Sequence, residues 1–468
     1  MDVSPPPAYT LRSVKPLTFH DAARRFAEGA DTPRDYLDRC LGTIAAREPV
    51  VQAWVALNEA GAREAAEAST ARWRSGRPLS AIDGMPIGIK DLLETRDMPT
   101  RMGCVAQRDN FPKRDNAAVW ALRQAGAVVL GKTVTAELGG THPGPTTNPF
   151  DPARTPGGSS SGSAAAVAAS MVPAAIGTQV GGSIIRPASY CGNVALKPTQ
   201  GAINRGERQA TSMSTHGVHA NCTQDMWQVA IEIARRVGGD PGRPGLFGPI
   251  APPPAQRPGS LAVMETAGWA TLDEAARTAF ERVLEQLRAQ GVTVLRRGDH
   301  AWIEAFERAI EGAQALANEI TAWENRWSIR NLVDQHPDAV SARAKAGLAM
   351  AERLSPDDYR AKLLQRDEAR RRHAALAPFV DAMIAPASPG PAPIWAGDVA
   401  GQPLAARPTG DSVFNTPSSA LGAPVVTVPL TTVQGLPMGI QVMGQPHADA
   451  RTVGFARWML EGLEPVVA

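Results

Sequence analysis

Apolar residues recur at helical spacing in two stretches of the first third of the chain. From residue 18 to residue 75 the pattern is helical almost throughout, and Thr32 followed by Pro33 is typical of an N-cap with proline in the first turn. Residues 115–126 repeat the pattern and end at a glycine. We therefore predict helices in both stretches.

Strand-like patterns separate these helices from the next ones. In residues 84–90 isoleucine alternates with small residues, which predicts a short strand with Lys90 at its end. Continuous apolar runs at 127–130 and 174–178 predict two buried strands. The alanine-rich residues 164–171 predict a buried helix between them, because small side chains permit close packing.

The second half of the chain begins with a β–α–β pattern. A linker rich in proline and glycine covers about 239–259, and strands are expected at 261–264 and 292–295. The helix between them is expected to begin with a capping box from Thr271 to Glu274.

Residues 300–377 are mostly helical in pattern and form a candidate cap over an active site. This segment contains Trp302, Trp323 and Trp327, most of which we interpret as core residues, with one as a candidate for the substrate pocket. Strand-like patterns then return at three places, namely 382–384, 425–428 and 439–443.

Strands that alternate with helices predict an α/β fold, with a large mixed, mostly parallel, twisted sheet covered by helices on both faces. We divide the chain into an N-terminal helical region packed on the core, residues 1–75, and an α/β domain, residues 76–468. Active sites in such sheets lie where strands end and loops begin. Lys90 falls at such a boundary.

Composition and charge narrow the class of protein. The chain has 468 residues, of which 43% are hydrophobic and 20% charged, as in ordinary globular proteins. A formal net charge of +2 gives no case for a nucleic-acid or membrane partner. The run 370–372 of three arginines, next to Asp367 and Glu368, is interpreted as a solvated helix face.

The cysteine pattern bears on the compartment and on metals. The four cysteines are too widely spaced for a disulfide framework, a metal site or a redox motif. Around Pro5–Pro7 no signal segment is recognisable, and no stretch reaches ~18 apolar residues. We expect a cytoplasmic protein without a metal or cofactor. The cysteines are Cys40, Cys104, Cys191 and Cys222.

Two glycine-rich serine segments carry the candidate chemistry. Ser159 lies in a loop that opens a helix, and Ser183 follows a strand and two glycines, 24 positions later. One helix and one strand would return the chain to the same sheet edge. A serine becomes nucleophilic when a base removes its proton, and a buried, neutral Lys90 could do so with a second serine as relay. The backbone N–H groups available for an oxyanion are those of Val180, Gly181, Gly182 and Ser183.

Taken together, these segments resemble the amidase signature family over about residues 60–460. The resemblance implies that Ser183 is the nucleophile, Ser159 the bridging serine and Lys90 the general base. It places a non-proline cis bond at Gly158–Ser159, and Gly158, Ser160 and Arg186 are expected to support the site. The matching segments are Lys90, 131–133, 157–162, 181–192, 196–199 and 435–441.

This chain departs from the family pattern at two positions. Ile185 stands where the family often has arginine, and Gln179 stands where it usually has aspartate. Both changes bear on substrate preference more than on the chemistry.

Other interpretations of the same residues are weaker. Gly158-x-Ser160-x-Gly162 matches a nucleophile elbow, but residues 148–156 before it contain three prolines and cannot form the strand that an elbow needs. The loop also lacks the spacing of a phosphate-binding loop. Further residues receive structural roles: His216 and His219 as loop or pocket residues, Lys197 as structural, and Cys191 as a buried small side chain.

The expected function is hydrolysis of a carboxamide, such as an aryl amide, through an acyl-enzyme that releases acid and amine. A carbamate or urethane hydrolase with the same catalytic set, and a glutaminase-type subunit of a multi-protein amidotransferase, remain alternatives. The expected partner is a small-molecule amide or carbamate. Residues that precede the serine loop are expected to line the pocket: Thr135, Glu137, Gly139, Gly140 and Thr141.

Overall fold

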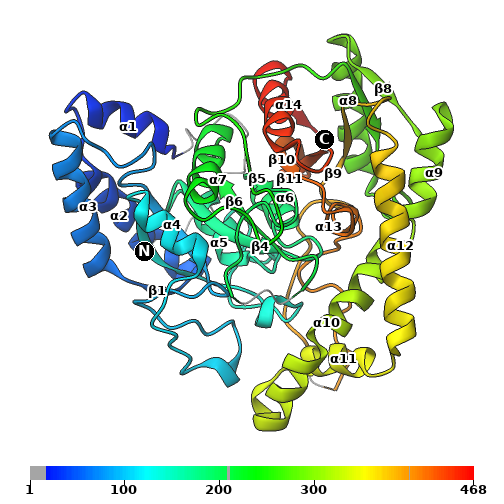
Figure 1. Cartoon of the computed structure of the whole chain (residues 1–468), viewed down its shortest axis with the longest axis horizontal. Coiled ribbons are helices and arrows are strands. Elements are labelled where there is room, and N and C mark those ends of the chain that lie inside the picture. Colours follow the sequence, from blue (N-terminus) through cyan, green and yellow to red (C-terminus); the bar gives the residue numbers. More distant parts are fainter. Residues whose placement is uncertain (1–16, 208–210, 400) are drawn as a thin grey trace.

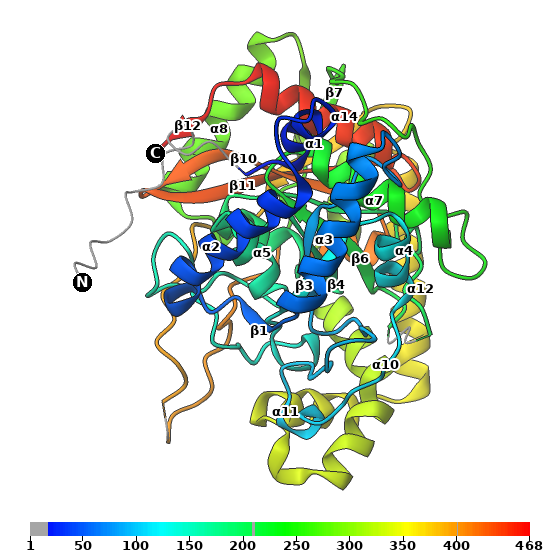
Figure 2. The same ribbon diagram turned by 90° about the vertical axis from the view of Figure 1, so that its left-hand side faces the viewer.

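A computed structural model describes residues 17–207, 211–399 and 401–468, arranged as a sheet with helices on both faces (Figures 1 and 2). The sequence features near Pro5–Pro7 lie outside these residues. No described helix is both long and apolar enough to cross a membrane.

The helices are α1 (Phe19–Ala27), α2 (Pro33–Val51), α3 (Glu59–Arg74), α4 (Ala117–Gln124), α5 (Ser161–Ala168), α6 (Ile185–Cys191), α7 (Thr223–Val237), α8 (Glu274–Ala289), α9 (Ala301–Ile310), α10 (Ala313–Gln335), α11 (Ala342–Ala351), α12 (Pro356–Ala374), α13 (Thr416–Leu421) and α14 (Asp449–Gly462). The strands are β1 (Trp54–Leu57), β2 (Pro86–Lys90), β3 (Val128–Thr133), β4 (Ala174–Gln179), β5 (Val194–Lys197), β6 (Thr215–Ala220), β7 (Ser260–Val263), β8 (Thr293–Leu295), β9 (Ala382–Pro386), β10 (Val425–Val433), β11 (Leu436–Met443) and β12 (Val466–Val467).

The strands form one mixed sheet in the order β1-β3-β2-β4-β6-β5-β10-β11-β9-β7-β8, with β12 paired to β10. Parallel pairs occupy the two flanks, β3-β2-β4 and β9-β7-β8, while the centre from β4 to β9 is antiparallel. The predicted α/β fold with a mixed sheet is confirmed. Its parallel flank places the end of β2 beside the end of β4, where Lys90 lies.

Strand β3 shows why its sequence is apolar without alternation. Successive side chains of a strand point to opposite faces. Val128 and Leu130 pack with α2, α3 and α5, whereas Val129 packs in the cluster that contains α4 and α7. Both faces of this flank are therefore covered by helices, which is the condition under which a strand becomes a continuous hydrophobic run.

One strand in the N-terminal region escaped the sequence analysis. Residues 18–75 were expected to be helical, but β1 separates α2 from α3 and pairs with β3 at the edge of the sheet. Gln52 ends α2 in a left-handed conformation, and Asn58 caps α3 immediately after β1. β1 has only four residues and lies between two long helices. It is too short to change the helical period of the hydrophobic residues around it, so the sequence pattern does not reveal it.

Three further expectations need correction. Asp273, not Thr271, caps α8, because its carboxylate accepts from the backbone N–H of Ala276. The helix expected at 164–171 begins three residues earlier, at Ser161. Trp302 and Trp327 are exposed, at 42% and 78%, because α9 and α10 turn those positions to the surface.

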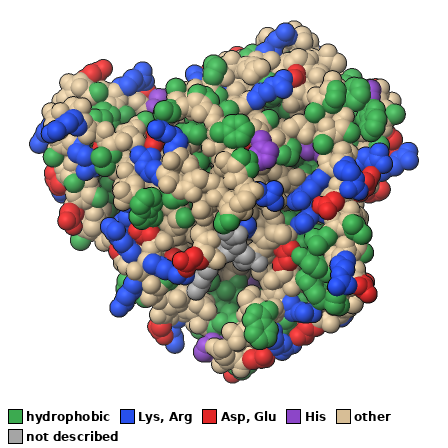
Figure 3. Space-filling view, viewed as in Figure 1, with side chains coloured by type: hydrophobic (Ala, Val, Ile, Leu, Met, Phe, Trp, Pro, Cys, Tyr) green, Lys and Arg blue, Asp and Glu red, His purple; other side chains and the backbone are tan. Residues whose placement is uncertain are grey.

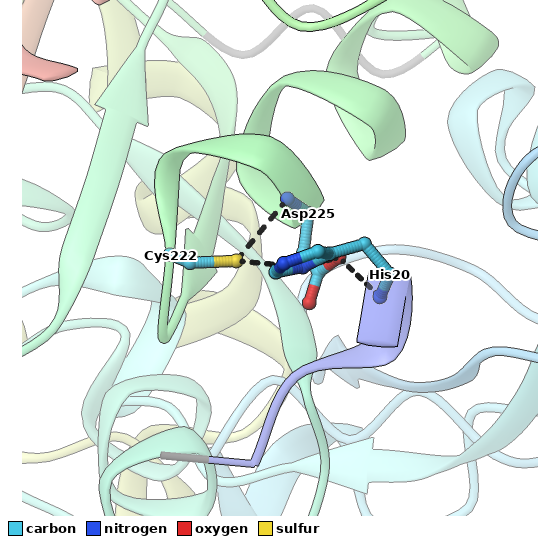
Figure 4. A group of neighbouring side chains, drawn as sticks. All are labelled: His20, Cys222 and Asp225. Atoms are coloured by element: carbon cyan, nitrogen blue, oxygen red, sulfur yellow. Dashed lines mark hydrogen bonds and ion pairs between the residues drawn. The ribbon is translucent and has the colours of Figure 1, made fainter. Parts of the chain in front are cut away.

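Helix α1 is fixed to the body of the protein by a buried carboxylate. Asp225, in the first turn of α7, accepts hydrogen bonds from the backbone N–H groups of Phe19 and His20, at 2.6 and 3.0 Å. Figure 4 shows the sulfur of Cys222 directed at the His20 ring, with Asp225 beside it. Asp225 thus satisfies N–H groups that the start of α1 would otherwise leave unpaired.

We expect Asp225→Ala to lower the free energy of unfolding by about 1–3 kcal/mol, because two buried N–H groups lose their acceptor. Urea unfolding followed by circular dichroism measures the loss. Asp21→Ala is the matched control, since Asp21 lies on the exposed side of the same helix turn and should cost less than about 1 kcal/mol. Equal losses in the two variants would contradict this role for Asp225.

Candidate active site

Lys90 ends β2 as a completely buried side chain. Its Nζ lies within hydrogen-bond distance of the Oγ atoms of Ser159 (2.7 Å) and Ser160 (2.9 Å), and of Thr178 through Oγ1 (2.9 Å) and the carbonyl oxygen (3.3 Å). Each of these partner atoms is a neutral oxygen. A charged amine here would be desolvated without a carboxylate to balance it.

The surroundings of Lys90 favour its neutral form. Burial lowers the pKa of Lys90 well below its usual value, and the positive charge of Arg186 lowers it further. A neutral amine has a free lone pair and can accept a proton. The arrangement therefore supplies a base at a pH where an exposed lysine would be charged.

The two serine segments meet beside Lys90. The Gly158–Ser159 peptide bond is cis, at the position that the family resemblance implies. The backbone N–H of Ser160 donates to the carbonyl of Ser183 at 3.3 Å, so the loop before α5 touches the turn between β4 and α6. Ser160 Oγ also donates to the carbonyl of Thr178. Lys90, Ser159 and the Ser183 turn are thus brought together, as their placement at strand ends predicted.

The turn that carries Ser183 borders a cavity, and its backbone N–H groups are unpaired among the described residues. These N–H groups belong to residues 180–183, and the same four residues line the cavity. Gln179 stabilises the turn from below, since its Oε1 accepts from the N–H groups of Ile184 and Ile185, at 2.9 and 3.0 Å. Ser183 is half-buried, and its hydroxyl makes no hydrogen bond to a described residue.

Arg186 is a buried guanidinium that joins three parts of the site. It donates to the carbonyl oxygen of Gly158 at 2.7 Å, and to Thr409 through the carbonyl (2.8 Å) and Oγ1 (3.2 Å). Burial lowers the pKa of Arg186, with no carboxylate in direct contact among the described residues. It therefore holds the cis peptide segment and places a positive charge near Lys90.

A cavity of about 350 Å³ opens at Ser183. Of the residues expected there, Glu137, Gly139, Gly140 and Thr141 line it, whereas Thr135 is buried behind them with its hydroxyl bonded to a backbone carbonyl. In Figure 3, which has the same view as Figure 1, the surface is hollowed between the N-terminal half and the region of α10 and α11.

Helices α10 and α11 form the opposite wall of the cavity. The Glu137 carboxylate ties the two walls together, because it accepts from the backbone N–H of Ser341 at 3.0 Å and from the Ser341 hydroxyl. The sequence did not identify these wall residues, since a helical surface position looks alike whether it faces solvent or a substrate. They are Ala317, Asn318, Thr321, Ala322, Asn325, Arg326, Ile329, Arg343, Ala344, Gly347, Leu348 and Met350.

The two departures from the family pattern lie behind the cavity wall. Ile185 is completely buried in the main hydrophobic cluster and does not line the cavity. Gln179 is also buried, and its amide donates to Ser419 while its oxygen holds the turn. They therefore shape the Ser183 turn rather than contact a substrate in the cavity.

The two histidines, Lys197 and Cys191 that the sequence singled out are all buried, and none of them lines the cavity at Ser183. His216 and His219 belong to β6, not to a loop, and burial lowers the pKa of each ring to about 3, so both are neutral. Lys197 is buried near Asp449, and burial lowers its pKa to about 7. Cys191 is buried, as expected.

One group of described side chains has the composition of a metal site, although widely spaced cysteines gave no sign of it. It comprises His20, Cys222 and Asp225, whose ligand atoms lie within 4.8 Å of one another. The Asp225 oxygens already accept from the start of α1, and the Cys222 sulfur accepts from the backbone of Asp225. These hydrogen bonds show that the group joins the start of α1 to the start of α7.

Comparison with known proteins gives a consistent result. Residues 35–453 match the family described as Amidase. The chain is 33% identical to the A subunit of the glutamyl-tRNA(Gln) amidotransferase of Chloroflexus aurantiacus, covering 93% of this chain and 94% of that protein. The corresponding protein of Myxococcus xanthus is 31% identical, with 94% and 96% covered.

Solved structures agree with these relatives. A crystal structure of an amidase superposes with a TM-score of 0.82 at 28% identity, covering 96% of this chain and 100% of that one. The native peptide amidase from Stenotrophomonas maltophilia superposes with a TM-score of 0.75 at 26% identity, covering 95% and 96%.

The charge state of Lys90 can be measured without a substrate. An unfolded lysine takes up its proton below about pH 10.4, whereas the lowered pKa keeps folded Lys90 neutral to lower pH. The unfolded chain then binds more protons, so stability falls as the pH drops from 10 to 8. We expect Lys90→Met to reduce this slope by up to about 1.4 kcal/mol per pH unit, measured by urea unfolding.

Lys113→Met, at an exposed lysine, is the control and should leave the slope unchanged. An unchanged slope in Lys90→Met would mean that Lys90 is charged in the folded protein.

Proposed function

This chain belongs to the amidase family and cleaves amide C–N bonds, and we propose that Ser183 is its nucleophile, Lys90 its general base and Ser159 the relay between them. The observation that carries the proposal is the buried contact of 2.7 Å between Lys90 Nζ and Ser159 Oγ, next to the cavity in which Ser183 lies.

The first step forms a bond between Ser183 Oγ and the carbonyl carbon of the amide. The Ser183 proton passes to Ser159, whose own proton passes to neutral Lys90. Ser183 Oγ forms no hydrogen bond to a described residue, which leaves it able to turn toward Ser159 as substrate enters. Catalytic hydrogen bonds often tighten only in the complex.

The negative charge that develops on the carbonyl oxygen is placed at the turn before α6. Four successive N–H groups there, from Val180 to Ser183, lack acceptors among the described residues and border the cavity. They cannot reorganise freely, because Gln179 and Ser419 fix the turn on either side. Pre-oriented donors of this kind stabilise a tetrahedral intermediate.

The C–N bond then breaks, and Lys90 returns its proton through Ser159 to the leaving amine. This leaves an acyl group on Ser183. Water attacks the acyl carbon with the same groups acting as base, and the acid is released.

Arg186 is proposed as a positioning residue. Its hydrogen bond to Gly158 supports the segment that presents Ser159, and its charge favours neutral Lys90. Ser160 is proposed to fix Lys90 from the other side, through the bond of 2.9 Å to Nζ.

The substrate is proposed to be a small molecule, since a cavity of about 350 Å³ lies over Ser183. Apolar wall residues such as Leu138, Ile329 and Leu348 support an amide with an aryl or alkyl part. A carbamate offers the same carbonyl carbon to Ser183. Measuring kcat/KM for an anilide and an aryl carbamate with the same aryl group would distinguish the two classes. A higher kcat/KM for the anilide would support an amide substrate, and a higher value for the carbamate would support a carbamate.

A second proposal follows from the similarity to amidotransferase components, one of which is 33% identical over 93% of this chain. It holds that the chain acts as the glutaminase-type component of an assembly. Glutaminase activity that arises only with partner proteins, together with inactivity of the isolated chain on anilides, would support it.

We also propose a cytoplasmic location, supported by four cysteines that form no disulfide.

We expect Ser183→Ala to lower kcat by about 10³-fold or more, because no bond to the acyl carbon can form. Ser161→Ala is the matched control at the start of α5. The Ser161 hydroxyl donates to the carbonyl of Val134, and its removal should leave kcat nearly unchanged. Mass spectrometry after mixing with an activated ester should find an acyl adduct on the wild type only. Full activity in Ser183→Ala would refute the assignment.

We expect Arg186→Gln to move the acid limb of the kcat/KM profile to higher pH. Lys90 must be neutral to act as base, and removal of the nearby positive charge raises its pKa, so a higher pH is needed for activity. Arg186→Lys keeps the charge and should keep the limb in place. A purely structural role would instead lower activity equally at every pH.

A further inference from the structure

A second polar cavity, of about 230 Å³, lies on the other side of α13 from the site of Ser183. It is bordered by α12 and by the segments that follow β5 and α7. Its charged lining consists of four arginines and a single acid, namely Arg205, Arg243, Arg366, Arg370 and Asp240. Nothing in the amide-cleaving site uses these residues.

The only acid of this lining is already engaged. Asp240 accepts from Arg205 Nε at 2.6 Å and from the Arg205 backbone at 2.9 Å, and both side chains are buried. Arg205 also donates to the carbonyl of Thr211. The Arg205 guanidinium is thereby neutralised, and the other three arginines have no partner acid within the lining itself.

Arg366 is the most deeply buried of these three arginines, and it has a single hydrogen-bond partner among the described residues. Its side chain is 9% exposed, Nη1 donates to Ser212 Oγ at 2.7 Å, and Nε is buried without a partner. No carboxylate among the described residues lies within ion-pair distance of it. Glu324, on the far side of Ser212, is held instead by the Ser212 backbone N–H and by Tyr359.

Arg370 was expected on a solvated helix face, and the structure corrects that expectation. Only Arg371 and Arg372 lie on the outer face, where both pair with Glu368. Arg370 turns inward. It donates to the carbonyl of Ala420 at 3.0 Å and to Gln200 Oε1 at 3.1 Å, and it forms an ion pair with Asp367 at 3.7 Å.

The charge of Arg370 is poorly balanced at this position. Burial, followed by the positive charges of Arg366 and Arg243, lowers the pKa of Arg370 to about 10, although Asp367 acts in the opposite direction. Arg243 reaches the cavity from the segment after α7, with its alkyl part over Gly201 and no acid partner among the described residues.

We propose that this cavity binds a phosphate group, either as inorganic phosphate or as a small phosphomonoester. Guanidinium groups bind phosphate oxygens in pairs, and a buried cation without a counter-ion, such as Arg366, is costly. Arg243, Arg366 and Arg370 approach from two separate segments. A tetrahedral anion offers acceptors to all three, whereas a planar carboxylate has only two oxygens.

The test is isothermal titration calorimetry of the full chain with inorganic phosphate, in a chloride buffer of constant ionic strength. We expect saturable binding to one site. Arg366→Met should weaken it at least about 10-fold, which corresponds to 1.4 kcal/mol. Arg243→Gln, at an exposed side chain that can be changed without disturbing the core, should weaken it as well.

Arg371→Gln is the matched control, because this neighbour on α12 pairs with Glu368 outside the cavity. Phosphate should bind that variant as tightly as it binds the wild type. Titration with a phosphomonoester then distinguishes the two sources of the group by affinity.

Three results would overturn the proposal. They are the absence of saturable phosphate binding to the wild type, undiminished binding in Arg243→Gln, and acetate binding as tight as phosphate binding, which would indicate a site for carboxylates of a partner protein. Since none of these variants touches Ser183 or Lys90, amide cleavage should persist in them. Failure here therefore leaves the proposed catalytic roles untouched.

Discussion

The burial of Lys90 without a carboxylate is the constraint on which the site depends. A lysine at this depth is tolerated because hydroxyl and carbonyl oxygens surround its amine, and because loss of its proton removes the cost of an isolated charge. Those oxygens come from the loop before α5 and from the end of β4. The parallel pairing of β2 with β4 is what brings these segments to one edge of the sheet.

The site is therefore assembled by backbone geometry before side chains refine it. Ser160 N–H contacts the carbonyl of Ser183, and Gln179 and Ser419 hold the turn that follows β4. Arg186 completes the arrangement, because one guanidinium both supports Gly158 and biases the protonation of Lys90. The amide chemistry of the family then needs only a carbonyl group placed over the turn.

The sequence was sufficient to predict the elements that have a clear hydrophobic period and the residues that belong to recognisable motifs. Glycines and strand ends singled out Ser159 and Ser183 as candidates for the proposed catalytic roles, the family resemblance added Lys90, and several apolar strands were predicted from their periods. The sequence could not reveal β1, whose four residues are stabilised only by pairing with β3. Nor could it show that Arg370 turns inward while Arg371 turns out, since both belong to one polar helix and only tertiary packing separates them.

The wall formed by α10 and α11 has an evolutionary consequence. The residues around Lys90 come from β2, β4 and the loops next to them, while the wall that faces Ser183 across the cavity comes from a segment about 150 residues later in the chain. Surface positions of helices tolerate exchange far better than a buried amine and its ring of oxygens. Substrate range can thus change through α10 and α11 while the proposed catalytic residues stay the same, so a few substitutions in these helices can alter specificity without altering the chemistry.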